Sequence, residues 1–317
     1  MTGMPSKPAK APLPKARIIA HGAKALADTS LNEAVTHARE QGFACDVRLT
    51  WEEGDDRALV AEAASMGISH LIAAGGDGTL HHVAAGIMSL GKSADTMSLG
   101  VLPLGTANDF ANSAGLASDV KEALITALSA PVVAVDLAEV NGDAMINVAT
   151  GGFGAKVTAE TPDNLKNRLG KAAYVLTGMF KAFNLGTEEV TLSGPDLDWH
   201  GEVYAIIVGN GRQAGGGIEL CPDAVIDDGL LDVTILPKEE NTSWTQLLEG
   251  YLGSGWAGLA EHTLHWQVPR LSIKTATPLH FNLDGEALQD SQFEFRVHPG
   301  ALHMHLPLTC PLLKKAC

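Results

Sequence analysis

Short apolar runs alternate with helical patterns between residue 17 and about residue 130. The apolar runs predict strands over residues 17–20, 45–51, 71–74 and 98–102. Helical spacing of apolar positions predicts helices over residues 31–41, 55–66, 79–90 and 119–128. This alternation is typical of a parallel sheet with helices on both faces, in which ligands bind beyond the carboxyl ends of the strands. Thr50 and residues 75–79 and 104–109 fall at those ends.

From about residue 132 the pattern changes to short apolar runs bounded by Gly, Asn, Asp and Pro. These runs predict strands over residues 132–140, 144–148, 188–192, 201–208, 230–236, 270–274, 280–283 and 293–297. Helical spacing is clear only over residues 165–183 and 244–260. The second half is therefore predicted to be mainly β, as a sandwich.

We accordingly predict an α/β protein in which a doubly wound α/β nucleotide-binding domain is followed by a larger β-rich sandwich domain. The first domain is expected to cover residues 17–133 and the second residues 134–300. Residues 1–16 contain prolines and lysines but no apolar core, so we expect a disordered tail rather than a signal peptide.

Charge and cysteine content narrow the class of partner. The formal net charge is −15, from 22 basic and 37 acidic residues, which argues against nucleic acid and against electrostatic docking to an anionic membrane. The four cysteines lack the spacing of a zinc site and are too few for a disulfide framework. No apolar run approaches the roughly 18 residues of a membrane span. We expect a reduced, cytoplasmic protein with no transmembrane segment.

The sequence Gly75-Gly76-Asp77-Gly78-Thr79 directly follows an apolar stretch and carries the clearest chemistry. Adjacent glycines bring backbone N–H groups close to phosphate oxygens, and a helix starting near Thr79 points its positive end at the same place. Asp77 supplies the carboxylate that a nucleotide-bound Mg²⁺ requires. These features predict a nucleoside triphosphate site, and the alternative is a glycine-rich turn that only joins a strand to a helix.

A second match to a phosphate-binding pattern is misleading. Residues 86–93 fit the Walker A spacing, but a helical pattern precedes them and a strand follows, so Gly91 is expected to end a helix.

The histidine pairs His81-His82 and His303/His305 lack a third ligand, so we do not expect them to bind a metal.

Three other loops offer functional groups. Residues 104–110 combine a turn with a hydroxyl, an amide and a carboxylate, which suits nucleotide contacts or simply a helix cap by Asn108 or Asp109. Residues 220–230 supply the oxygen ligands of a hard cation, or form an Asx turn. Asp284 and Glu286 end a strand, where one of them can accept a proton from a hydroxyl or where the chain makes an Asp-Gly hairpin.

Five ordered motifs together resemble the diacylglycerol kinase catalytic family and, within it, bacterial YegS-type lipid kinases. The motifs occupy residues 75–79, 102–111, 149–154, 209–217 and 281–286, and the resemblance covers nearly everything after the tail. It implies an ATP-binding α/β domain, a β-rich lipid-substrate domain, a cleft between them, and a C-terminal segment (301–317) that returns to the first domain. The implied reaction transfers the γ-phosphate of ATP, with Mg²⁺, to a lipid hydroxyl; phosphatidylglycerol and diacylglycerol are the candidate acceptors.

The resemblance also implies roles for particular residues. Glu286 falls at the position of the proton acceptor, with Asp284 as a nearby second carboxylate. Asp228 and the carbonyls of Val225 and Leu230 fall at a second cation site, for Mg²⁺ or alternatively Ca²⁺. The positions that match the family's ATP contacts are Thr50, Gly76, Asp77, Gly78, Thr79, Leu80, His81, His82 and Thr106.

The chain departs from the family pattern at Ala74, where the family usually has Gly, and at His81-His82, where it has Asn-Glu. The second departure keeps open a nucleotide-binding regulator without catalysis. A kinase acting on NAD or a sugar phosphate would share the phosphate loop. Contact with a membrane surface could come from Lys166, Arg168 and Lys171 on the helix 165–183, although that helix could equally be an ordinary amphipathic surface element.

Overall fold

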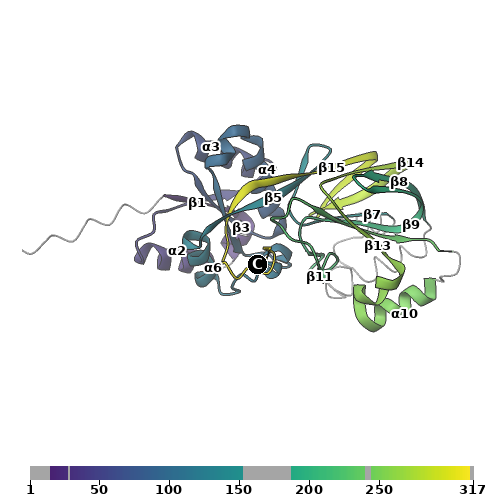
Figure 1. The fold of residues 1–317 in the computed structure, drawn as a ribbon. Coiled ribbons are helices and arrows are strands. Elements are labelled where there is room, and N and C mark those ends of the chain that lie inside the picture. Colours follow the sequence, from purple (N-terminus) through teal and green to yellow (C-terminus); the bar gives the residue numbers. More distant parts are fainter. Residues whose placement is uncertain (1–14, 28, 153–186, 240–243, 315–317) are drawn as a thin grey trace, which may run out of the picture.

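The computed structural model describes residues 15–27, 29–152, 187–239 and 244–314 and shows two lobes joined by long strands (Figure 1). The predicted helix 165–183 with its basic residues, the first fourteen residues of the predicted tail, and Cys317 lie outside the described residues.

The N-terminal lobe is a parallel sheet with helices on both faces, as predicted. Its strands are ordered β2 (Cys45–Thr50), β1 (Ala16–His21), β3 (His70–Gly75) and β4 (Ser98–Pro103). The helical elements are α1 (Gly22–Ala27), α2 (Ser30–Glu40), α3 (Asp55–Ser65), α4 (Asp77–Ser89), the 3₁₀ helix η1 (Gly91–Thr96), α5 (Asp109–Ser113) and α6 (Val120–Ser129).

Two apolar layers hold these helices to the sheet. On one face, α3 and α4 pack with Ile19, Leu71 and Ala73; on the other, α2 and α6 pack with Ile18 and Ile72. Successive strand residues point to opposite faces, so the continuous apolar runs of β1 and β3 serve both layers. Because the four strands are parallel, they all end at the same edge of the sheet, where the loops after β2, β3 and β4 meet.

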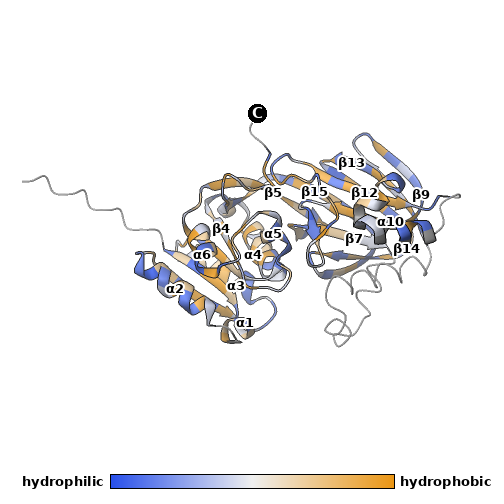
Figure 2. Cartoon of the chain, turned by 90° about the horizontal axis from the view of Figure 1, so that it is seen from below, coloured by the Kyte–Doolittle hydropathy of each residue, from blue (hydrophilic) through white to orange (hydrophobic). Residues whose placement is uncertain are grey.

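The β-rich lobe is built around two long strands. Its members are β5 (Val132–Val140), β6 (Asp143–Met145), β7 (Val148–Gly152), β8 (Glu188–Gly194), β9 (Leu197–Gly209), β12 (Leu231–Pro237), β13 (Leu264–Val268), β14 (Arg270–Leu283) and β15 (Glu286–His305). β8 pairs with the first halves of β9 and β14, and β7 pairs with their second halves. The long strands thus enclose an apolar interior that includes Phe281, Phe293 and Phe295. Figure 2 shows orange, apolar stretches along the strands of both lobes.

Several predicted strand limits were wrong. The runs 270–274 and 280–283 belong to one strand, β14, whose register shifts between Lys274 and Leu279. The run 293–297 is the middle of β15, which is 20 residues long, and the predicted strand 144–148 is split between β6 and β7. The predicted helix 244–260 becomes α10 (Trp244–Ser254) followed by the 3₁₀ helix η2 (Gly255–His262). Polar residues within the long strands interrupt their apolar runs, so the sequence pattern predicted shorter strands than the structure has.

β15 and β5 connect the two lobes. They pair antiparallel, and Met304 of β15 also pairs with Leu99 of β4, so one sheet continues from the β-rich lobe into the N-terminal lobe (Figure 1). Beyond β15, Leu306 and Leu312 are buried in the same apolar layer as α4. The C-terminal segment therefore returns to the first lobe, as the family resemblance implied.

Two histidines are stacked in the core where β15 reaches the N-terminal sheet. The rings of His70 and His305 are 4.0 Å apart at their centroids, and each ring bonds a backbone carbonyl, that of Ala127 or Ala130. Burial, together with the neighbouring His305 ring, lowers the pKa of His70 to about 4, and burial also lowers the pKa of His305. Both rings are therefore held neutral in the folded protein at pH 7.

Folding stability should fall as the pH drops below 6.5. Unfolded His70 binds a proton near pH 6.5 and the folded protein binds it only near pH 4. Protonation in this window therefore favours the unfolded chain by roughly 3 kcal/mol at pH 4. In urea titrations, His70→Phe should be less stable at pH 7 but should flatten this pH dependence. A surface variant, His37→Gln, should keep the wild-type slope, and an unchanged slope in His70→Phe would contradict the assignment.

Candidate active site

The loop after β3 and the loop after β4 are in direct contact. The N–H groups of Leu104 and Gly105 donate to the carbonyl oxygen of Gly75, at 2.8 and 3.0 Å. A Cβ on Gly105 would overlap the Cα of Gly76, and a Cβ on Gly76 would lie 3.2 Å from the Cα of Gly105. Gly105 needs to be glycine because the two backbones approach closely, and a Cβ at Gly76 would be a tight fit. The predicted phosphate motif and the 104–110 loop therefore form one surface.

The helix α4 begins at Asp77, two residues earlier than predicted, with Gly76 as its N-cap residue. No side chain caps this end. The first-turn N–H groups of a helix have no partner within the helix, so they are available to phosphate oxygens. This geometry supports the phosphate-loop interpretation over a simple connecting turn.

Asp77 is held in place by the neighbouring loop. One of its two carboxylate oxygens, Oδ1, accepts a hydrogen bond from the N–H of Phe110 at 3.1 Å. Within the described part of the chain, no three His, Cys, Asp or Glu side chains gather as metal ligands. One carboxylate suits Mg²⁺, which keeps several waters and takes other ligands from substrate phosphates. The residues at this edge therefore fit an ion that arrives with a nucleotide.

Lys24 is a candidate phosphate ligand that the sequence analysis missed. It lies in α1, directly after β1, and its Nζ is 3.4 Å from where a Cβ on Gly76 would be. The available signal was a lysine three residues after the first strand, at the same sheet edge as the glycine motif.

The remaining predicted nucleotide positions differ in what their side chains can do. Thr50 is buried at the end of β2, and Thr106 is exposed on the loop after β4. Thr79 and Leu80 are buried, with Leu80 in the apolar layer beneath the sheet. Thr79 can therefore contribute to a ligand mainly through its backbone, whereas the N–H of Leu80 already donates to the carbonyl oxygen of Gly76.

Asp284 joins the hairpin between β14 and β15 to a distant loop. Its carboxylate accepts hydrogen bonds from the N–H groups of Ile146, Asn147 and Val148 at 2.7, 2.9 and 3.1 Å. His81 Nδ1 lies 3.2 Å from its second oxygen, and the Asp284 side chain is 0% exposed. The turn itself is a two-residue hairpin with positive φ at Asp284 and Gly285. Asp284 is thus fully engaged in holding the backbone, and in this respect it differs from Glu286.

Glu286 faces solvent, with its side chain 61% exposed. His82 Nε2 lies 3.9 Å from Glu286 Oε1, and His82 Nδ1 lies 3.5 Å from Asp56 Oδ2. His82 is four residues after Gly78 on α4, so both lie on one helix face, and helical side chains lean toward the N-terminus. Glu286 therefore lies beside the face of α4 that His82 shares with Gly78 of the first turn.

Two further aspartates bind backbone N–H groups from distant loops. Asp109, for which nucleotide contacts or a helix cap were the two alternatives, accepts hydrogen bonds from the N–H groups of Gly216 and Gly217. Asp136 accepts from Gly229 at 2.6 Å and from Gly300 at 2.9 Å. No local pattern could predict these contacts, because each joins residues more than 90 positions apart.

The predicted second cation site lies beside Asp136. Asp228 Oδ1 accepts a hydrogen bond from the N–H of Leu230 at 3.0 Å. Burial and the negative charges of Asp136 and Asp227 raise the pKa of Asp228. A cation would relieve this repulsion, so the donor set of Asp228 and nearby carbonyls fits a hard ion.

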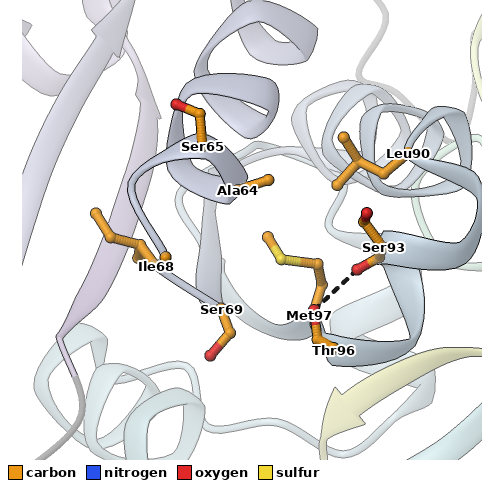
Figure 3. Close-up of a pocket in the computed structure, with 9 residues that line it drawn as sticks. Ala64, Ser65, Ile68, Ser69, Leu90, Ser93, Thr96 and Met97 are labelled. Atoms are coloured by element: carbon orange, nitrogen blue, oxygen red, sulfur yellow. Dashed lines mark hydrogen bonds between the residues drawn. The ribbon is translucent and has the colours of Figure 1, made fainter.

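A separate cavity of about 510 Å³ lies at the opposite edge of the N-terminal sheet. Its lining includes Ile68 and Ser69, which precede β3, and Met97, which precedes β4 (Figure 3). These residues lie at the amino ends of the strands, away from the glycine motif. The cavity is therefore not part of the candidate active site.

The fold and the phosphate loop define a two-lobed, nucleotide-dependent phosphotransferase, and comparison with known proteins agrees. The diacylglycerol kinase catalytic domain matches residues 15–140, and the YegS C-terminal NAD kinase beta sandwich-like domain matches residues 147–306. The chain belongs to the family of YegS-like lipid kinases.

Curated relatives and a solved structure cover nearly the whole chain. A "Probable lipid kinase YegS-like" from Pseudomonas savastanoi pv. phaseolicola is 46% identical over 304 residues, 95% of this chain and 96% of the relative. One of the same description from Stenotrophomonas maltophilia is 45% identical over 305 residues, 95% of this chain and 98% of the relative.

The crystal structure of a "putative diacylglycerol kinase from Bacillus anthracis str. Sterne" superimposes with a TM-score of 0.81 at 25% identity, covering 98% of this chain and all of that one. The family is one of ATP-dependent kinases with an alcohol acceptor. Among the described residues, none of the helices is both long and apolar enough to span a bilayer.

Asp284→Asn should destabilise the protein by about 2–4 kcal/mol, because an amide cannot accept all the hydrogen bonds of the buried carboxylate. Urea unfolding should show a lower midpoint. The exposed Asp198→Asn is the matched control and should unfold like the wild type. Equal stability of the two variants would show that the Asp284 bonds do not hold this hairpin.

Proposed function

We propose that this protein transfers the γ-phosphate of ATP to a hydroxyl of a membrane-derived glycerolipid, with phosphatidylglycerol and diacylglycerol as the candidate acceptors. The observation that carries this proposal is the exposed Glu286 beside His82, on the face of α4 that also carries Gly78 of the uncapped first turn. A carboxylate in this place can receive the acceptor hydroxyl's proton while the helix terminus binds phosphate.

The residues of the candidate site have distinct roles in the proposed reaction. The N–H groups of residues 76–79 and the ammonium group of Lys24 bind phosphate oxygens, and Thr50 and Thr106 contact the nucleotide. Asp77 is the protein ligand of Mg²⁺, which neutralises phosphate charge when bound. Glu286 accepts the proton of the attacking hydroxyl. The contact of Asp77 with Phe110 supports this arrangement, since it joins the two nucleotide loops.

The proposal also includes a second cation site and the location of the protein in the cell. We place Mg²⁺ or Ca²⁺ at Asp228 and the carbonyls of Val225 and Leu230, on the evidence of the crowded carboxylates there. We also propose a cytoplasmic location, where ATP is available; the free thiols of Cys45, Cys221 and Cys310 are consistent with a reducing compartment.

The acceptor can be identified with γ-labelled ATP and Mg²⁺ in mixed micelles of phosphatidylglycerol or diacylglycerol, with NAD as a soluble control. Label on one lipid identifies the substrate class. Label on NAD alone would favour a soluble acceptor. ATP binding without any transfer would favour a regulator that has lost catalysis.

Gly78→Ala should weaken ATP binding by about tenfold, or roughly 1.4 kcal/mol, without harming the fold. A Cβ at Gly78 meets nothing within 4 Å, so the added methyl group would occupy only the space reserved for phosphate. Isothermal titration measures the affinity. Gly253→Ala in α10, also in open space, is the control and should bind ATP normally. Normal affinity in Gly78→Ala would move the phosphates away from this helix end.

Glu286→Gln should lower kcat by about 10²–10⁴-fold, because the amide cannot accept the hydroxyl proton. The dissociation constant for ATP should be unchanged, since Glu286 lies outside the phosphate loop. Glu40→Gln, an exposed change in α2, controls for loss of a surface charge. Turnover near the wild-type value in Glu286→Gln would rule out Glu286 as the proton acceptor.

A further inference from the structure

His82 lies between two carboxylates that come from different lobes. Asp56 belongs to α3 in the N-terminal lobe, and Glu286 is the first residue of β15. The ring presents Nδ1 to Asp56 at 3.5 Å and Nε2 to Glu286 at 3.9 Å. Each nitrogen of one imidazole ring therefore faces its own carboxylate.

The protonation state of the ring decides whether both contacts can form. A protonated imidazole donates from both nitrogens, whereas the neutral ring donates from one only. Only the protonated ring can therefore bridge Asp56 and Glu286.

The two carboxylates are held unequally. The Asp56 side chain is 11% exposed, and its Oδ1 is buried with no hydrogen-bond partner among the described residues. Glu286 is far more exposed and can rotate into solvent. Because an unpaired buried carboxylate is the more costly of the two, a neutral His82 should keep Asp56 and release Glu286.

We propose that His82 is a positioning residue whose protonated ring, anchored by Asp56, holds Glu286 across the two lobes in the place where it accepts the substrate proton. This inference rests on the proposed role of Glu286. It also gives a function to the histidine that stands where the family usually has glutamate.

The surroundings of His82 set the sign of the pH dependence. From α3, Asp56 and Arg57 face the ring; from β15, Glu286 does; within α4, His81 makes an edge contact at 5.4 Å and itself binds Asp284. The hydrogen bond to Asp56 and the charges of Asp56 and Glu286 raise the pKa of His82, while burial and Arg57 oppose this. The bridge should therefore exist below the raised pKa of His82 and be lost as the pH rises through it.

The test combines a titration of His82 with a pH profile of activity, both on the full chain. In ¹⁵N-histidine spectra, assigned with His82→Gln, the His82 pKa should exceed 6.5 and should fall in both Asp56→Asn and Glu286→Gln. In the kinase assay, kcat should decline on the alkaline side as His82 deprotonates. His82→Gln should lower kcat by about tenfold at pH 6.5 and remove this decline.

Two variants complete the test. His82→Arg keeps a permanent cation with several donors, so it should restore activity and extend it to alkaline pH. His37→Gln, on the surface of α2, should leave the profile unchanged. A His82 pKa that ignores Glu286→Gln, or a normal profile in His82→Gln, would overturn the proposal. If Glu286→Gln itself remains active, the proposed proton acceptor fails instead, and the titration still reports whether the bridge exists.

Discussion

The structure depends on buried aspartates that bind backbone N–H groups from distant parts of the chain. Asp284 is the clearest example, since it joins the β14–β15 hairpin to three consecutive N–H groups of the loop before β7. Asp109 and Asp136 are also buried and bind the N–H groups of Gly217 and Gly300 in the same way, and the partly buried Asp77 binds the N–H of Phe110. Charge-assisted bonds of this kind are short and strong, and leaving such a buried carboxylate unpaired is costly. They therefore fix loops that no regular hydrogen-bond ladder would hold.

This arrangement divides the chemistry between the lobes. The N-terminal lobe offers backbone N–H groups and one lysine at the carboxyl edge of its sheet, which suits phosphate. The β-rich lobe brings an exposed carboxylate to the same helix face through β15. Because β15 also pairs with β4, the strand that begins at Glu286 ends within the N-terminal sheet. The distance between the two halves of the site is thus set by a continuous strand rather than by a flexible linker.

Local patterns were sufficient for the parallel strands and the longer helices of the N-terminal lobe and for the glycine motif, but not for α1, η1 and α5. The apolar runs of β1 and β3 and the helical spacing of α2 and α6 are strong periodic signals. The β-rich lobe was harder, because β14 and β15 carry polar residues midway and change register there. The site was predicted as a set of loops, but not how they connect. Asp109 acts through contacts with Gly216 and Gly217, far along the chain, and sequence spacing carries no information about those.

Asp284 and Glu286 lie in the same hairpin but differ in role: Asp284 holds the backbone, and Glu286 is the proposed proton acceptor. Both are acidic and only two positions apart, but the first is fully enclosed and the second is mostly exposed. Residues in a tight hairpin cannot move independently, so fixing Asp284 also restricts the backbone of Glu286. What remains free is the Glu286 side chain, and His82 is the group placed to restrain it. The two histidines of α4 thus contact the two acids of the hairpin: His81 contacts Asp284, which holds the backbone, and His82 contacts Glu286, the proposed proton acceptor.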